Sequence, residues 1–158
     1  MAAPDTPLLI AYDGSDAARR AVHAAADLFG SRQALVVTVW EPGLAYESSM
    51  ITGVDMSPVP VDIEGAQEVE EEMHKRASHT AREGAELAQS LGLQATGLAV
   101  ADEVHVADTI VELAEKRGAA AIVVGSRGLK GLRARLEGST SNAVLRAASC
   151  PVVVVHDD

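Results

Sequence analysis

Apolar runs alternate with amphipathic stretches along the chain, and this alternation predicts the fold. The apolar runs are short and rich in β-branched residues, and they show no strict apolar–polar alternation. Such runs are typical of strands buried on both faces of a parallel sheet. Five strands are therefore predicted, at residues 8–12, 34–40, 93–101, 119–124 and 151–156. Thr96 and Gly97 interrupt the third run and indicate a less buried or an edge position.

Between these runs, apolar residues recur three to four positions apart, as on one face of a helix. Ser15 is suited to cap the first helix and Gly30 to end it. Further helices are predicted at 63–91, from Val106 to Gly118, and at 142–148. Strands joined by helices favour right-handed crossovers. The sequence thus predicts an α/β fold: a doubly wound, Rossmann-like, five-stranded parallel sheet flanked by four helices.

The chain of 158 residues is interpreted as one domain spanning residues 1–158. Residues 1–7 are expected to form a flexible N-terminus. Residues 41–61 depart from the strand–helix rhythm and hold three of the six prolines, so they are expected to form a long loop. Nothing in the composition of that loop indicates a chemistry.

Composition and charge exclude several classes of partner and indicate a cellular location. The net charge of −10 argues against nucleic acid and against an anionic membrane surface as partners. No apolar run approaches the roughly 20 residues that cross a bilayer. A lone cysteine, Cys150, cannot form an internal disulfide and is interpreted as a packing residue. The cytoplasm is the expected location.

The most informative segment is 125–141, which follows an apolar run and leads into a predicted helix. Gly125, Gly128 and Gly131 would let backbone N–H groups approach an anion, and Gly138 to Ser141 open the helix. Five basic residues and one acid lie between positions 126 and 146, in an otherwise acidic chain. This segment indicates a phosphate site. The alternative is that the glycines only turn the chain from strand to helix.

Other chemistry is poorly supported. The loop matches neither a Walker A loop nor Gly-x-Gly-x-x-Gly, and the histidines lack metal-binding spacing. Asp13 follows the first strand, where its carboxylate would accept hydrogen bonds from ribose hydroxyls or hold a metal through water. It is equally suited to a turn before the first helix. Because ligands bind beyond the carboxyl ends of parallel strands, Asp13, Val39 and Gly125 are expected to meet.

Three segments resemble the universal stress protein family over essentially the whole chain. They are Leu-Leu-Ile-Ala-Tyr-Asp-Gly-Ser at 8–15, Ile-Val-Val-Gly-Ser-Arg-Gly at 122–128, and Gly-Ser-Thr-Ser-Asn-Ala-Val-Leu-Arg at 138–146 followed by Cys-Pro-Val-Val-Val-Val. The pattern Gly-x2-Gly-x9-Gly-Ser/Thr is met by Gly125, Gly128, Gly138 and Ser139. It marks the nucleotide-binding branch of that family, whose fold resembles that of adenine nucleotide alpha-hydrolases.

The resemblance implies binding of ATP or AMP, with Mg as a possible companion. Ala11 and the backbone of Val39 would lie at the base, and Asp13 near ribose or phosphate. The loop would supply the remaining contacts, from Gly125, Ser126, Arg127, Gly128, Gly138, Ser139, Thr140 and Ser141. The resemblance also implies a homodimer that forms through Val152–Val155, and a protein partner of unknown identity.

Two departures from the family pattern are visible. Residues 101–105 replace a Gly-Asp-Pro-like turn, and Trp40 follows the adenine position, where core packing is favoured over stacking on the base. The predicted function is nucleotide-dependent signalling in a stress response without efficient catalysis, because no Walker B acid or arginine finger is recognisable. The alternatives are a slow Mg-dependent ATPase or nucleotidyl transferase, and a nucleotide-independent dimeric adaptor.

Overall fold

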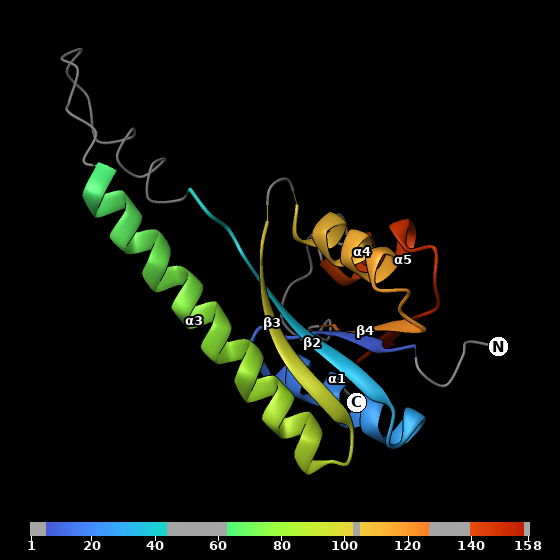
Figure 1. Ribbon diagram of the computed structural model, residues 1–158. Helices are drawn as coiled ribbons and strands as arrows, with labels where there is room; N and C mark the ends of the chain where they lie inside the picture. Colours follow the sequence, from blue (N-terminus) through green and yellow to red (C-terminus); the bar gives the residue numbers. More distant parts are fainter. Residues whose placement is uncertain (1–5, 44–62, 103–104, 127–139, 157–158) are drawn as a thin grey trace.

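The computed structural model describes residues 6–43, 63–102, 105–126 and 140–156 (Figure 1). Its strands form one parallel sheet in the order β3-β2-β1-β4-β5. The strand bounds are Leu8–Ala11 for β1, Gln33–Trp40 for β2, Gln94–Ala101 for β3, Ala121–Gly125 for β4 and Val152–Val155 for β5. The predicted five-stranded parallel sheet is confirmed, and β3 is an edge strand as Thr96 and Gly97 indicated.

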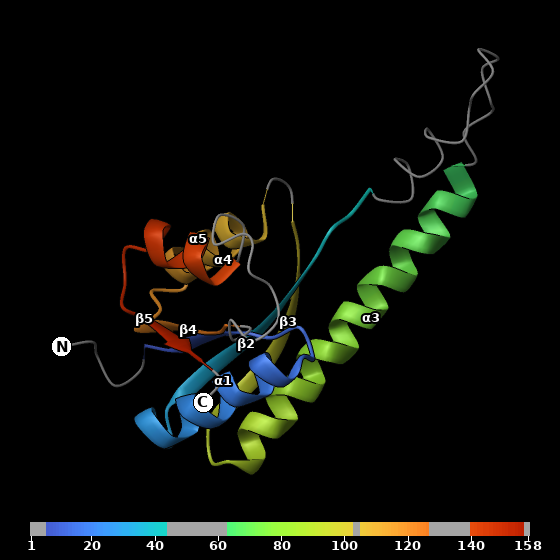
Figure 2. The same cartoon turned by 180° about the vertical axis from the view of Figure 1, so that it is seen from behind.

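Helices cover both faces of the sheet (Figures 1 and 2). One face carries α1 and α3, and the other carries α4 and α5. The bounds are Asp16–Phe29 for α1, Ile63–Ser90 for α3, Val106–Lys116 for α4 and Thr140–Ala147 for α5. This two-sided cover is the doubly wound arrangement expected from the alternating pattern. No helix within the described ranges is long and apolar enough to cross a bilayer.

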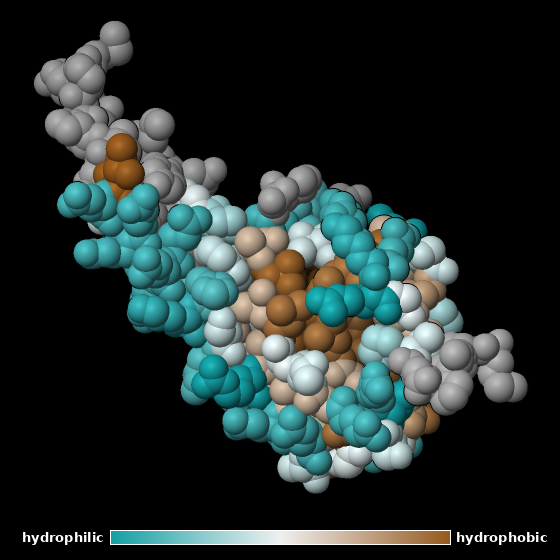
Figure 3. Space-filling view, in the orientation of Figure 1, coloured by the Kyte–Doolittle hydropathy of each residue, from teal (hydrophilic) through white to brown (hydrophobic). Residues whose placement is uncertain are grey.

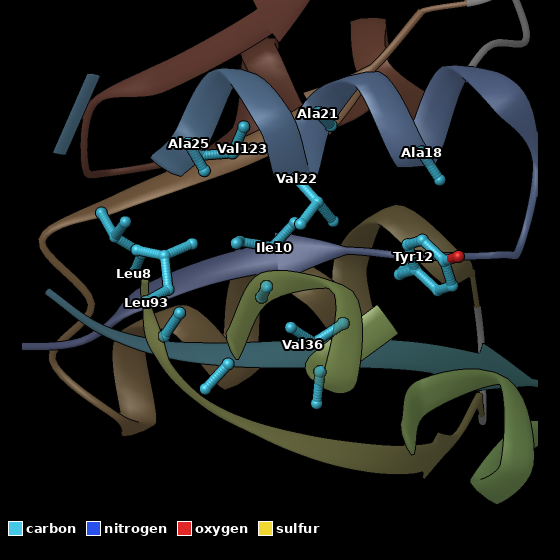
Figure 4. Packing of buried hydrophobic residues seen from close by; sticks show 14 of the residues in the cluster. Leu8, Ile10, Tyr12, Ala18, Ala21, Val22, Ala25, Val36, Leu93 and Val123 are labelled. Carbon is cyan, nitrogen blue, oxygen red and sulfur yellow. The ribbon is translucent and has the colours of Figure 1, made fainter. Parts of the chain in front are cut away.

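Two clusters of buried side chains fill the two interfaces between helices and sheet. In the first, Ala21, Val22 and Ala25 of α1 pack on Ile10 and Val123 (Figure 4). In the second, Leu9, Val37 and Ile122 of the sheet pack on Ile110 and Val144. Because strand residues alternate between faces, each strand contributes to both clusters. This explains why the strands read as continuous apolar runs.

Polar and glycine residues fix the ends of α1. The Ser15 hydroxyl accepts a hydrogen bond from the Ala18 N–H at 3.2 Å, which satisfies one of the free donors of the first turn. Gly30 follows the last turn with φ of 63° and donates its N–H to Ala26 O. Both predicted caps are confirmed.

Small residues let α3 approach the sheet closely. The buried positions of α3 are all alanine or glycine. A Cβ on Gly84 would lie 2.7 Å from the Tyr12 ring, and one on Gly97 of β3 would lie 2.5 Å from Ala81 O. Both contacts are shorter than packed atoms allow. Glycine at these two positions therefore sets the distance between α3 and the sheet.

Some predicted segments differ from the structure or lie outside it. The fourth strand begins at Ala121 and includes Gly125, and the last helix begins two residues earlier than predicted, at Thr140. Residues 1–5 and most of 41–61 lie outside the described residues. Cys150 is half-buried beside the second cluster, and burial raises the pKa of its thiol, in keeping with a packing role.

The close approach of α3 predicts the effect of a substitution. Gly84→Ala would normally stabilise a helix, but here the new methyl group would collide with Tyr12 and Val36. We expect it to lower the free energy of unfolding by about 1–3 kcal/mol. Urea denaturation measures this, with His79→Ala at an exposed position of α3 as the control. A Gly84→Ala protein as stable as the control would contradict the packing described.

Candidate functional site

The candidate site lies at the carboxyl ends of β1 and β4, where the chain order of the strands reverses. Ala11 pairs with Val37 of β2, and Ile10 pairs with Val123 of β4. Asp13, which follows β1, and Gly125, which ends β4, therefore reach the same edge of the sheet. Crevices at such a reversal are where open α/β sheets bind ligands. The ends of β2, β1 and β4 are thus neighbours at one edge, while a meeting of Asp13, Val39 and Gly125 themselves stays a prediction.

Buried hydrogen bonds hold the end of β1 against β2. The Tyr12 N–H donates to Val37 O at 2.8 Å, and the Thr38 hydroxyl donates to Tyr12 O at 2.8 Å. Thr38 and Tyr12 are both buried. A buried carbonyl that loses its donor is costly, so the Thr38 hydroxyl stabilises the position from which the chain enters the candidate site.

The Tyr12 side chain connects this strand end to two helices. Its hydroxyl lies 3.4 Å from Glu83 Oε1 of α3, which also forms an ion pair with Arg19 of α1 at 2.6 Å. Burial and the Glu83 carboxylate raise the pKa of the Tyr12 phenol, so it stays protonated at neutral pH. The Arg19 side chain is 48% exposed and that of Glu83 is 41% exposed, so water screens their ion pair and it adds little stability.

Asp13 lies exposed at the start of α1. Its Oδ1 accepts a hydrogen bond from the Ser15 N–H at 3.0 Å. This contact confirms the turn role that the sequence allowed for Asp13. The role in binding a ribose or a metal remains a prediction, and it is compatible with the exposure of the carboxylate at the sheet edge.

Gly125 has a packing role of its own. A Cβ at this position would collide with the carbonyl oxygen of Ala17, in the first turn of α1. The absence of a side chain therefore lets the end of β4 lie directly against α1. A substitution of Gly125 would disturb this packing whether or not a ligand binds nearby.

Ser126 links the candidate site to the last strand. Its N–H donates to Val155 O at 2.8 Å, and its hydroxyl lies 3.3 Å from the same oxygen. The hydroxyl also contacts His156 Nδ1 at 2.6 Å. Sequence reasoning did not assign His156 to the site, because the contact joins residues 30 positions apart. The register of β4 with β5 brings them together.

Trp40 ends β2 and is half-buried rather than part of the core. Its ring lies 5.5 Å from the ring of His74 on α3, with 49° between the planes. Val39, beside it, packs at the margin of the second cluster. The contact with His74 was not predicted, since helical spacing alone places His74 on a solvated face.

The residue that follows β3, Asp102, carries a buried carboxylate. The Asp102 N–H donates to Trp40 O at 2.7 Å, and Asp102 Oδ1 accepts from the Thr109 hydroxyl at 3.0 Å. These bonds attach the end of β3 to β2 and to α4. Sequence reasoning did not single out either residue for this role.

The remaining predicted site residues fall in two groups. Thr140 and Ser141 begin α5, with Thr140 exposed and Ser141 buried. Arg127, Gly128, Gly138 and Ser139 lie outside the described residues. The phosphate loop therefore stays a prediction from the sequence.

Two hollows formed by described residues lie away from this site. One, of about 450 Å³, is at the amino ends of the strands and is lined by residues such as Pro7, Gln33, Gln94 and Arg117. The other, of about 490 Å³, lies between α3 and β3. Neither contains a predicted site residue. The described residues hold no cluster of three or more His, Cys, Asp or Glu that would bind a metal.

The fold is that of a doubly wound α/β protein, and its candidate site lies where the strand order reverses. The model of the universal stress protein family matches residues 6–156. Universal stress protein YxiE of Bacillus subtilis is 33% identical over 151 residues, which cover 94% of this chain and 97% of that protein. The chain belongs to the universal stress protein family, as its motifs predicted.

Solved structures share the fold. A universal stress protein from Archaeoglobus fulgidus has a TM-score of 0.67 at 22% identity, covering 95% of this chain and 98% of that one. A universal stress protein solved in complex with cAMP has a TM-score of 0.64 at 24% identity, covering 99% and 100%. An Archaeoglobus fulgidus universal stress protein in complex with dAMP has a TM-score of 0.59 at 21% identity, covering 97% and 99%.

The hydrogen bond that holds the end of β1 can be tested directly. Thr38→Val keeps the shape of the side chain but leaves the buried Tyr12 carbonyl without this donor. We expect the free energy of unfolding to fall by about 1–3 kcal/mol in urea denaturation. Thr96→Val on the exposed part of β3 is the control, and an equal effect of both substitutions would argue against the role given to Thr38.

Proposed function

We propose that this protein binds an adenine nucleotide, ATP or AMP, at the carboxyl edge of the sheet between β1 and β4. The observation that carries the proposal is the strand reversal, which puts the carboxyl ends of β1 and β4 at neighbouring positions on one edge of the sheet. Helices here run opposite to the strands, so α1 and α5 begin at this edge of the sheet. The positive ends of their helix dipoles favour a negatively charged ligand there.

The family supports an adenine ligand. The two related structures described with cAMP and dAMP share the fold and carry an adenine base with a phosphate. In this chain, Ala11 and the Val39 backbone would contact the base, and Asp13 the ribose. Gly125, Ser126, Arg127 and Gly128 would line the ribose and phosphates, and the N–H groups of Gly138, Ser139, Thr140 and Ser141 would bind the phosphate tail.

We infer that the bound nucleotide regulates a stress response and is not consumed in rapid turnover. The sequence offers no recognisable general base or arginine finger for hydrolysis. Two alternatives remain: a slow Mg-dependent ATPase or nucleotidyl transferase with Asp13 at the metal through water, and an adaptor whose glycines serve packing alone. The contact between Gly125 and Ala17 favours a packing role for that one glycine, and it is compatible with all three functions.

We also infer that two copies pair through β5, in the cytoplasm. β5 is an edge strand of four half-buried valines, and an open apolar edge favours pairing with another strand. The lone Cys150 is compatible with a reducing compartment.

The nucleotide proposal predicts the effect of removing the Asp13 charge. Asp13→Asn keeps an oxygen that accepts the Ser15 N–H, so α1 should begin as before. The loss of a charged hydrogen bond to ribose should weaken AMP binding about tenfold. Isothermal titration calorimetry measures this, with Asp16→Asn, which removes the same charge at the first residue of α1, as the control. Equal affinities of both variants would remove Asp13 from the site.

Catalysis is tested separately. We expect purified protein to release phosphate from ATP no faster with Mg than without it. A phosphate-release assay with and without Mg, repeated on Asp13→Ala, measures this. Magnesium-dependent release that disappears in Asp13→Ala would replace the regulatory function with the enzymatic alternative.

A further inference from the structure

The outer edge of β3 carries a row of backbone groups that face away from the sheet. The Gln94 N–H donates to Arg32 O at 3.0 Å, and the Asp102 N–H donates to Trp40 O at 2.7 Å. Between these bonds the parallel register of β3 with β2 continues without a bulge. In such a ladder the residues at even positions bond to β2, and those at odd positions point outward. The outward residues are Ala95, Gly97, Ala99 and Ala101.

One of these outward backbone groups, the Ala95 carbonyl, accepts a hydrogen bond of the kind that a further strand would donate. The Gln89 side-chain amide of α3 donates to Ala95 O at 2.8 Å. Among the described residues no other hydrogen bond reaches the outward N–H and C=O groups of these four positions. The edge from Gly97 to Ala101 therefore offers donors and acceptors at the spacing of a further strand.

β3 lacks the features that usually prevent pairing at an edge. It is eight residues long, twice the length of β5, and contains neither a charged residue nor proline. Natural edge strands are commonly shortened, bulged or charged, because an open edge is a template for another strand. An unprotected edge of this length is compatible with a strand-binding surface.

A groove accompanies this edge. A hollow of about 490 Å³ lies between α3 and β3, bounded by residues 95–99 of the strand and by one face of the helix. Figure 1 shows α3 running along β3 at the side of the sheet away from β4, and the face of α3 that is visible in Figure 3 is mostly hydrophilic. The close contact of Gly97 with Ala81 O brings the helix near enough to form the wall.

The wall presents polar side chains at a spacing that suits a strand. His74, Ser78, Arg82 and Glu86 line the groove, each four residues after the last. Four residues of helix rise about 6 Å, and two residues of strand rise about 6.6 Å. Alternate side chains of an added strand would therefore meet successive members of this row. Arg82 and Glu86 have no ion-pair or hydrogen-bond partner among the described residues.

We propose that the groove between α3 and β3 binds an extended peptide segment of another protein, which adds to the sheet as a strand. Backbone hydrogen bonds to Gly97, Ala99 and Ala101 supply the affinity. A basic side chain of the peptide faces Glu86, and an acidic side chain two residues away faces Arg82. This charge pattern selects the partner. The surface is separate from the nucleotide site and from β5.

Two synthetic peptides test the proposal: acetyl-Lys-Val-Asp-Val-Thr-Val-amide and its charge-swapped form, acetyl-Asp-Val-Lys-Val-Thr-Val-amide. Each is titrated to about 1 mM into ¹⁵N-labelled protein, and amide shifts are followed by NMR. The first peptide should shift the amides of Gly97 and Ala99 and bind about threefold to tenfold tighter than the second. The variant Arg82→Glu/Glu86→Arg, whose net charge is unchanged, should reverse this preference.

Three outcomes would overturn the proposal. The Gly97 and Ala99 amides do not shift with either peptide, both peptides bind equally to both proteins, or the edge is already covered by a second copy. The last is recognised by sedimentation equilibrium as an association that Ala99→Pro abolishes, because proline removes an outward N–H without breaking a bond to β2. No nucleotide enters these experiments, so their failure leaves the proposed nucleotide site untouched.

Discussion

Parallel pairing of β1 between β2 and β4 is the constraint on which the rest of the structure depends. Because all five strands run in one direction, their carboxyl ends reach a single edge of the sheet. The chain leaves β1 toward β2 on one side, while β4 and β5 are added on the other. Such a reversal follows from the topology alone, and ligands of open α/β sheets bind at this position. Asp13 follows β1, and Gly125 and Ser126 end and follow β4, so all three belong to this edge of the sheet.

Small side chains fill the interfaces between the helices and the sheet. With few aromatic residues in the chain, the helices approach the sheet through alanine, valine and glycine. Gly84, Gly97 and Gly125 each meet a neighbouring element closer than a Cβ permits. The same approach places the polar face of α3 beside β3 and the first turn of α1 beside β4. Packing distances thus position both the proposed nucleotide site and the proposed peptide groove.

Most of the fold was predictable because its signals are local. Apolar runs, helical periodicity, Ser15 and Gly30 predicted five strands and four helices, with errors of one or two residues at most ends. Contacts between distant residues were not predictable: the Ser126–His156 contact, the Trp40–His74 contact and the Asp102–Thr109 bond depend on register and on helix packing. For the site, the sequence predicted which strand ends would meet, whereas the ligand contacts of residues 127–139 remain predictions from a motif.

The most direct measurement of the central claim is an NMR titration of ¹⁵N-labelled protein with AMP. If the carboxyl edge binds the nucleotide, the largest shifts will fall on the amides of Ala11, Asp13, Gly125 and Ser126. Amides at the opposite edge, such as Leu8, Gln33 and Ala121, will stay in place. The account is contradicted if AMP causes no shifts, or if they gather around Gln33, Gln94 and Arg117 in the hollow at the amino ends of the strands.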